Sequence, residues 1–180
     1  ARLKARAKDF AGALAVLDQA AKGTEGAEDA LKLQGDIQLY GRNDVEAALA
    51  AYQASIKTKP DYVTGYAAVV RTLMRQGKMD EAGKALEALK KVAGGKPETL
   101  YLQAQYAQQN KDIKTARDLA QQLLRMTPNS PLAQELAGVV ELQSNALVQA
   151  EALLAKAVQG GPELAVARRG LVTVYLRTGQ

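Results

Sequence analysis

A helix-breaking residue recurs at a constant interval along this chain, and this period limits the folds that are open to it. Pro162 follows Pro128 by 34 positions, and Pro60 lies two such periods before Pro128. The intermediate position, 34 residues after Pro60, is Gly94, in the stretch Gly94-Gly95-Lys96-Pro97. Because proline and glycine interrupt helices, the chain is predicted to consist of short repeated units, each closed by a break.

A series of alanines supports the same period from a different position in the unit. Small residues at a fixed phase allow two helices to approach closely, which favours packed helices over a sheet. The alanines that follow one another at this same interval of 34 positions are Ala48, Ala82, Ala116 and Ala150.

One unit is longer than the others by a single residue. Ala13 precedes Ala48 by 35 positions instead of 34. We interpret the extra residue as part of the turn at residues 41–44, which is one residue longer than the counterpart at residues 76–79 needs.

Each unit is predicted to form two helices joined by a short turn. In the unit after Pro60, Val69 and Leu73 are spaced as on one helical face, Gly77 provides the turn, and Ala82 and Leu86 lie on one stripe of the second helix. The expected pairs are residues 2–7 with 9–22, 30–40 with 45–57, 62–75 with 79–92, 98–109 with 113–126, and 132–143 with 147–158, followed by one unpaired helix at 164–177.

Three kinds of residue recur at the positions where the two helices of a unit should cross and where the unit should close. These are small residues (Gly35, Gly138 and the alanine series), large apolar residues four positions after the alanines (Tyr52, Leu86 and Leu154), and the closing prolines (Pro60, Pro128 and Pro162). With this pattern the 34-residue unit resembles the tetratricopeptide repeat (TPR) over essentially the whole chain.

The resemblance implies an all-α fold, a right-handed α-α superhelix formed by a TPR-like solenoid of about five 34-residue helix-turn-helix repeats. We expect one solenoid over residues 1–180, with a partial repeat at 1–27, repeats at 28–60, 61–94, 95–128 and 129–162, and an unpaired helix at 163–180.

A narrower resemblance concerns the last third of the chain. Residues 121–124 with Pro128, then 136–143, 149–157, 167–169 and 175–180, are similar to the PrsT family of long TPR proteins. That family is associated with the PEP-CTERM/exosortase sorting system and with exopolysaccharide clusters of Gram-negative bacteria. The resemblance implies a longer parent protein in the cell envelope or periplasm, and the first residue, Ala1, agrees with a segment cut from such a protein.

Composition argues against an enzyme and against several kinds of partner. The chain has no cysteine and no histidine, which excludes disulfides, thiolate metal sites and the commonest catalytic base. We therefore expect no catalytic residue, metal or cofactor, and we interpret the carboxylates Glu25, Glu28 and Asp29 as favourable charges at a helix start. No apolar run is long enough to span a membrane.

A nucleic-acid partner is also not expected. The net charge is +5, and the lysines and arginines are scattered without a run of five. Helical repeats that read bases use a regular set of side chains at one position of each unit. Here that position holds Asp36, Arg71, Gln105, Val139 and Thr173, which form no code.

The first helix of each pair lines the concave groove in proteins of this class, so its polar residues are the binding candidates. We expect them to hold a protein or peptide segment through Arg-carboxylate pairs and amide hydrogen bonds. The alternative is a structural spacer in a longer solenoid, with no binding site of its own. The candidate groove residues are Lys32, Asp36, Arg71, Arg75, Tyr101, Gln105, Gln108, Gln109, Glu135, Arg169, Thr173 and Arg177.

Two further expectations concern partners. Lys32 and Asp36 stand where some proteins of this class clamp a chaperone tail, but an aspartate would repel a terminal carboxylate, so we do not expect that function. The unpaired last helix should expose Leu171, Val172 and Tyr175, which predicts self-association through that helix.

Overall fold

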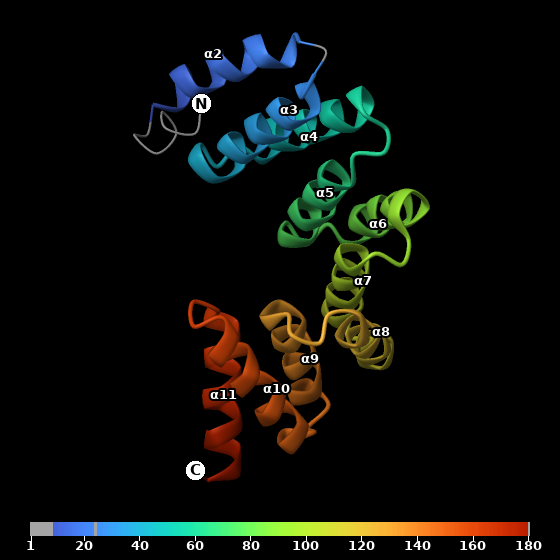
Figure 1. Cartoon of the computed structure of the whole chain (residues 1–180), viewed down its shortest axis with the longest axis vertical. Coiled ribbons are helices and arrows are strands. Elements are labelled where there is room, and N and C mark those ends of the chain that lie inside the picture. The colour runs from blue at the N-terminus through green and yellow to red at the C-terminus, as the bar shows by residue number, and fades with distance from the viewer. Residues whose placement is uncertain (1–8, 24, 180) are drawn as a thin grey trace. The chain divides into compact units, whose positions relative to one another are not determined.

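The computed structural model describes residues 9–23 and 25–179, and within these residues every regular element is a helix (Figure 1). The expected all-α fold is confirmed, whereas the helix expected at residues 2–7 lies outside the described residues. The largest difference in a helix start is at α3, which begins at Ala27 instead of residue 30. The elements are α2 (Phe10–Ala21), α3 (Ala27–Asp36), η1 (Ile37–Gly41), α4 (Val45–Thr58), α5 (Val63–Arg75), α6 (Met79–Ala93), α7 (Pro97–Gln109), α8 (Ile113–Met126), α9 (Pro131–Gln143), α10 (Leu147–Gly160) and α11 (Ala165–Thr178).

The helices form two compact units, each built from antiparallel helical hairpins (Figure 1). The first unit ends at Ala93 and contains α2, the α3–α4 hairpin with its η1 turn, and the α5–α6 hairpin. The second unit begins at Gly94 and contains the α7–α8 and α9–α10 hairpins, with α11 packed on α9 and α10. The repeat boundaries, and the assignment of the whole chain to one solenoid, stay predictions.

The small residues lie at the helix crossings, as their phase predicts. Ala13 and the four alanines of the series are all fully buried. A Cβ atom built on Gly35 would lie 2.3 Å from Cε1 of Tyr52, and one on Gly138 would lie 2.7 Å from Cγ of Leu154. Only glycine fits beneath these two large side chains without a shift of the packed helices.

A residue with positive φ follows the first helix of each hairpin from α3 onward, and another follows α11. Such a backbone conformation ends a helix and reverses the chain, and glycine or asparagine adopts it at least cost. The residues are Asn43, Gly77, Lys111, Asn145 and Gly179, with φ values of 56°, 71°, 62°, 60° and 76°. Because each follows the one before it by 34 positions, the turn recurs at the same place in each unit.

The extra residue of the first full unit lies in a helix, and our assignment of it to the turn is wrong. The segment η1 is a π-helical turn, in which the N–H of Arg42 donates to the carbonyl of Ile37 at 3.1 Å. The turn itself is constrained by two residues. Asn43 has the left-handed backbone conformation that reverses the chain, and the carboxylate of Asp44 caps α4 by accepting from the N–H of Ala47 at 3.0 Å. The inserted residue is therefore absorbed where only helix hydrogen bonds need to change, by widening the last turn.

Candidate functional site

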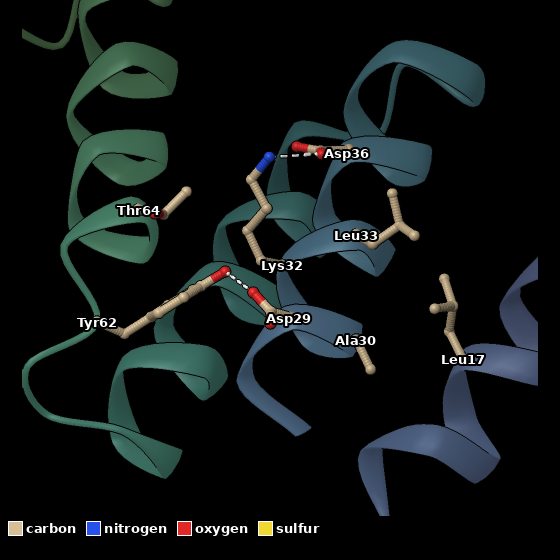
Figure 2. Close-up of a pocket in the computed structure, with 8 residues that line it drawn as sticks. All are labelled: Leu17, Asp29, Ala30, Lys32, Leu33, Asp36, Tyr62 and Thr64. Carbon is tan, nitrogen blue, oxygen red and sulfur yellow. Dashed lines mark hydrogen bonds and ion pairs between the residues drawn. The ribbon is translucent and has the colours of Figure 1, made fainter. Parts of the chain in front are cut away.

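A cleft of about 540 Å³ opens between α3 and α5 in the first unit (Figure 2). Its lining combines apolar side chains with charged and hydroxyl groups. The lining residues are Leu17 from α2, Asp29, Ala30, Lys32, Leu33 and Asp36 from α3, and Tyr62 and Thr64 at the start of α5.

Two contacts join the start of α3 to the chain around the start of α5. The hydroxyl of Tyr62 donates to the carboxylate of Asp29 at 2.5 Å, and Figure 2 shows the ring reaching across to it. The ammonium of Lys59 pairs with Glu28 at 3.3 Å. These carboxylates therefore hold neighbouring repeats together in addition to standing in the first turn of a helix. Burial, and then the bond to Asp29, raise the pKa of Tyr62 above its ordinary value.

The carboxylate of Asp36 has a donor on each oxygen. The ammonium of Lys32 lies 2.7 Å from Oδ2, and the hydroxyl of Tyr52 donates to Oδ1 at 3.0 Å. Tyr52 is almost fully buried, and this burial, followed by the negative charge of Asp36, raises the pKa of its phenol. Lys32 and Asp36 thus form an internal ion pair at the edge of the cleft, with Tyr52 beneath it.

A second, smaller cleft of about 140 Å³ shares Lys32 and Asp36 with the first. Its other lining residues are Tyr40, Tyr52, Ala68, Arg71 and Thr72. The guanidinium of Arg75 lies 5.1 Å from the centre of the Tyr40 ring, within the range of a cation–π contact.

Four of the groove residues chosen from the sequence are therefore gathered in the first unit. Lys32, Asp36 and Arg71 line the smaller cleft, and Arg75 lies over the ring of a residue that lines it. Sequence reasoning missed Tyr40 there. The signal available was the one-residue excess of the unit, which marks the segment around Tyr40 as different from its counterparts.

The phenols of Tyr52 and Tyr62, whose pKa values are raised, predict a loss of stability in alkaline solution. A phenol with a raised pKa in the folded state contributes stability that is complete below its ordinary pKa of 10.0 and is lost as the pH rises above it. We expect the urea midpoint to fall between about pH 10 and pH 12, and to fall less steeply in Tyr62→Phe. Equal slopes in the wild type and in Tyr62→Phe would show that this phenol does not contribute.

The candidates on α7 and α11 belong to the second unit. Gln105 donates to the hydroxyl of Tyr101 at 3.0 Å, one turn away on α7. On α11, the hydroxyl of Thr173 donates to the carbonyl of Arg169 at 2.9 Å, and Arg169 itself is exposed. Gln108 is half-buried, while Gln109 and Arg177 are exposed.

Glu135 is expected from the sequence to face the groove surface, but the structure places it in the interior. It is buried on α9, and its carboxylate accepts a hydrogen bond from the N–H of Ala167 at 2.7 Å. Ala167 lies in the first turn of α11, whose N–H groups have no helical partner, so this carboxylate caps the helix. Its physical role is to fix α11 to α9.

A second buried carboxylate on α9 has a partner that the sequence did not indicate. Glu141 accepts two hydrogen bonds from Nε of Arg117 on α8, at 2.9 and 3.0 Å, and a further one from Nη2. The forked contact raises the pKa of Arg117 and joins the two hairpins of the second unit.

The outer face of α11 carries exposed apolar side chains. Val172 and Leu176 are exposed, while Leu171 and Tyr175 are half-buried and Leu171 packs against the core beneath α11. Self-association through this helix stays a prediction.

Within residues 9–23 and 25–179, no three acidic side chains are grouped as a metal site would need. The same residues contain no helix that is long and apolar enough to cross a membrane.

Two protein-family models match the chain, and both are described as tetratricopeptide repeat. One matches residues 1–63 and 101–165, and the other matches residues 39–106. The narrower PrsT resemblance is not supported by these matches. No curated protein matches the chain.

Solved structures show the same fold at low sequence identity. A thermophilic TPR protein of Thermus thermophilus is 18% identical, with 84% of this chain and 83% of that chain covered and a TM-score of 0.71. PilF of Pseudomonas aeruginosa is 16% identical, with coverage of 87% and 71% and a TM-score of 0.73. YrrB, described as a TPR protein with an unusual peptide-binding site, is 17% identical, with coverage of 88% and 85% and a TM-score of 0.59.

Proposed function

Because this chain belongs to the tetratricopeptide repeat family, we propose that it is a scaffold that binds a segment of a partner protein along the first helices of its repeats. TPR units in general mediate contacts between proteins and are not catalytic. The proposal assigns the chain no enzymatic step, and it places the main binding surface at the two clefts of the first unit.

The observation that carries this proposal is the pair of adjoining clefts beside α3 and α5. They share Lys32 and Asp36, so one extended segment can occupy both without a break. The clefts are lined by cationic, anionic and hydroxyl side chains. These groups can donate hydrogen bonds to a peptide's backbone and side chains and accept bonds from them. YrrB, which has a similar fold, is described as having a peptide-binding site, and this supports the same kind of ligand.

The polar residues of α7 and α11, in the second unit, are a separate candidate surface. The side-chain amide of Gln105 donates to the hydroxyl of Tyr101 in the free protein, and both groups can exchange this bond for bonds to a peptide backbone. The set comprises Tyr101, Gln105, Gln108, Gln109, Arg169, Thr173 and Arg177, and it leaves out Glu135 because its carboxylate is used within the fold.

The narrower resemblance to PrsT extends the proposal to a cellular setting. Under it, the partner segment belongs to a protein of a bacterial sorting or exopolysaccharide system at the cell envelope. This extension rests on the similar segments between residues 121 and 180.

A photo-crosslinking amino acid placed at Thr64 tests the scaffold function directly. Thr64 is an exposed residue of the larger cleft, and Lys84 is an exposed residue on α6 that serves as the matched control. After irradiation in cells of the source organism, we expect a partner peptide attached at Thr64 and none at Lys84. Equal adducts at both positions, or no adduct at either, would favour the spacer alternative.

A further inference from the structure

We propose that Tyr40 and Arg75 form an anchor for an acidic side chain of the bound segment, and that the π-helical turn η1 exists to present it. The inference rests on the proposed binding function and specifies its chemistry.

The π turn brings Tyr40 to the surface at a position that is buried in two other hairpins and half-buried, as Gln108, in the α7–α8 hairpin. Tyr40 lies three positions before Asn43, the turn residue with positive φ. The residues three positions before the equivalent turn residues are Met74 in the α5–α6 hairpin and Leu142 in the α9–α10 hairpin. Met74 is 6% exposed and Leu142 is 9% exposed, whereas Tyr40 is 71% exposed. One inserted residue rotates the end of a helix by about 100°, which accounts for the reversal.

The widened turn carries a polar cost. The side-chain oxygen Oε1 of Gln38, within η1, is buried and has no hydrogen-bond partner among the described residues. A buried acceptor without a donor is unfavourable, and π turns are frequent at functional sites. The exposed aromatic ring is the feature that this turn adds to the surface.

The charges beside Tyr40 favour an anion. The smaller cleft is lined by Lys32, Arg71 and Asp36, and Arg75 adds a third cation above the Tyr40 ring. The two oxygens of Asp36 already accept bonds from Lys32 and from Tyr52, so its negative charge is largely offset within the protein. Because Lys32 and Asp36 pair with each other, the positive charge beside Tyr40 comes from Arg75, and it is complementary to an aspartate, glutamate or phosphorylated side chain.

The contact between Arg75 and Tyr40 prepares the guanidinium for this task. A guanidinium that lies over an aromatic ring uses its flat face for the contact, while its N–H donors point outward from its edge. Ordering the side chain before the ligand arrives lowers the entropy cost of binding. The uncovered part of the ring supplies apolar surface for the ligand's aliphatic carbons.

Fluorescence anisotropy with a labelled peptide of alternating Glu and Ala tests the anchor. We expect the wild-type chain to bind this peptide about tenfold more tightly than a peptide with Gln in place of Glu, the effect of one lost charge-assisted bond. Arg75→Gln and Tyr40→Ala should each weaken binding of the Glu peptide about tenfold. Lys84→Gln removes the same charge from an exposed site on α6 and should change binding less than about twofold.

Unchanged binding of the Glu peptide in both Arg75→Gln and Tyr40→Ala would overturn the anchor. A phosphoserine peptide that binds more tightly, and is weakened by the same variants, would support the anchor with phosphoryl as the source of the anion. The crosslink at Thr64 separates this result from the proposed function. If Tyr40→Ala is crosslinked to the partner at Thr64 with the same yield as the wild type, the scaffold function is supported and the anchor is contradicted.

A variant lacking Gln38 tests the role of the π turn itself. The deletion restores the regular spacing of the repeats, and we expect it to carry Tyr40 into the buried position held by Met74 in the next hairpin. The shortened chain should keep its helical circular dichroism and lose the preference for the Glu peptide. Retained preference in a folded deletion variant would show that η1 does not present Tyr40. If the shortened chain does not fold, Tyr40→Ala decides, because its exposed side chain can be removed with little effect on folding.

Discussion

Replacement of Tyr52 by alanine is expected to lower the free energy of unfolding by about 3–5 kcal/mol, the range for removing a large aromatic side chain from a core. Tyr52 is 1% exposed and is among the largest fully buried side chains of the described residues. Its ring lies against Gly35, where no side chain from α3 can move in to fill the space that the substitution leaves. Urea denaturation followed by circular dichroism measures the loss.

Two controls identify the source of this loss. Tyr52→Phe keeps the ring and removes only the hydrogen bond to Asp36, so it should cost about 1 kcal/mol. Tyr40→Ala removes an exposed tyrosine and should cost less than about 0.5 kcal/mol. If Tyr52→Phe were as destabilising as Tyr52→Ala, the hydroxyl would carry the stability and the packing argument would be wrong.

Replacement of Leu154 by alanine is expected to cost about 2–5 kcal/mol in the second unit. Leu154 is fully buried on α10 and lies between two glycines: a Cβ on Gly138 would be 2.7 Å from its Cγ, and a Cβ on Gly170 would be 3.0 Å from its Cδ1. The substitution therefore leaves a cavity between α9, α10 and α11. Leu132→Ala, at a half-exposed position on α9, is the matched control. A loss no greater than that of the control would contradict the nesting of Leu154.

The helices and their crossings could be predicted because they depend on residue types at fixed spacing. Close helix approach admits only small residues, so the alanine series and Gly138 reveal the crossings in the sequence itself. The breaks at Pro128 and Pro162 are equally local, since proline ends a helix wherever it stands beyond the first turn. These positions needed no knowledge of what lies next to them in space.

Other features depend on partners about one repeat away and could not be predicted in this way. Glu135 looks like a solvated side chain, yet its carboxylate accepts from the backbone of Ala167, 32 residues later. Asp29 looks like a helix-start charge, yet it holds the hydroxyl of Tyr62, 33 residues later. In both cases residue type and local spacing are unchanged by the contact, so only the three-dimensional arrangement identifies it.

The extra residue was detectable in the sequence, but its location was not. Loops usually accept insertions, which favoured the turn as its site. The turn is instead fixed by the left-handed backbone of Asn43 and by the cap at Asp44, and the helix end before it can change its hydrogen bonds at lower cost.

The π turn also has a consequence for how an array of duplicated repeats can diversify. Copies made by duplication start with identical surfaces, and substitutions alter those surfaces one side chain at a time. An insertion confined to one helix end changes the direction of several side chains in a single genetic event. The neighbouring copies keep their phase, because the left-handed residues that follow the change remain evenly spaced, from Asn43 to Gly77 and onward. One repeat can therefore acquire a new surface while the other repeats keep their helix packing.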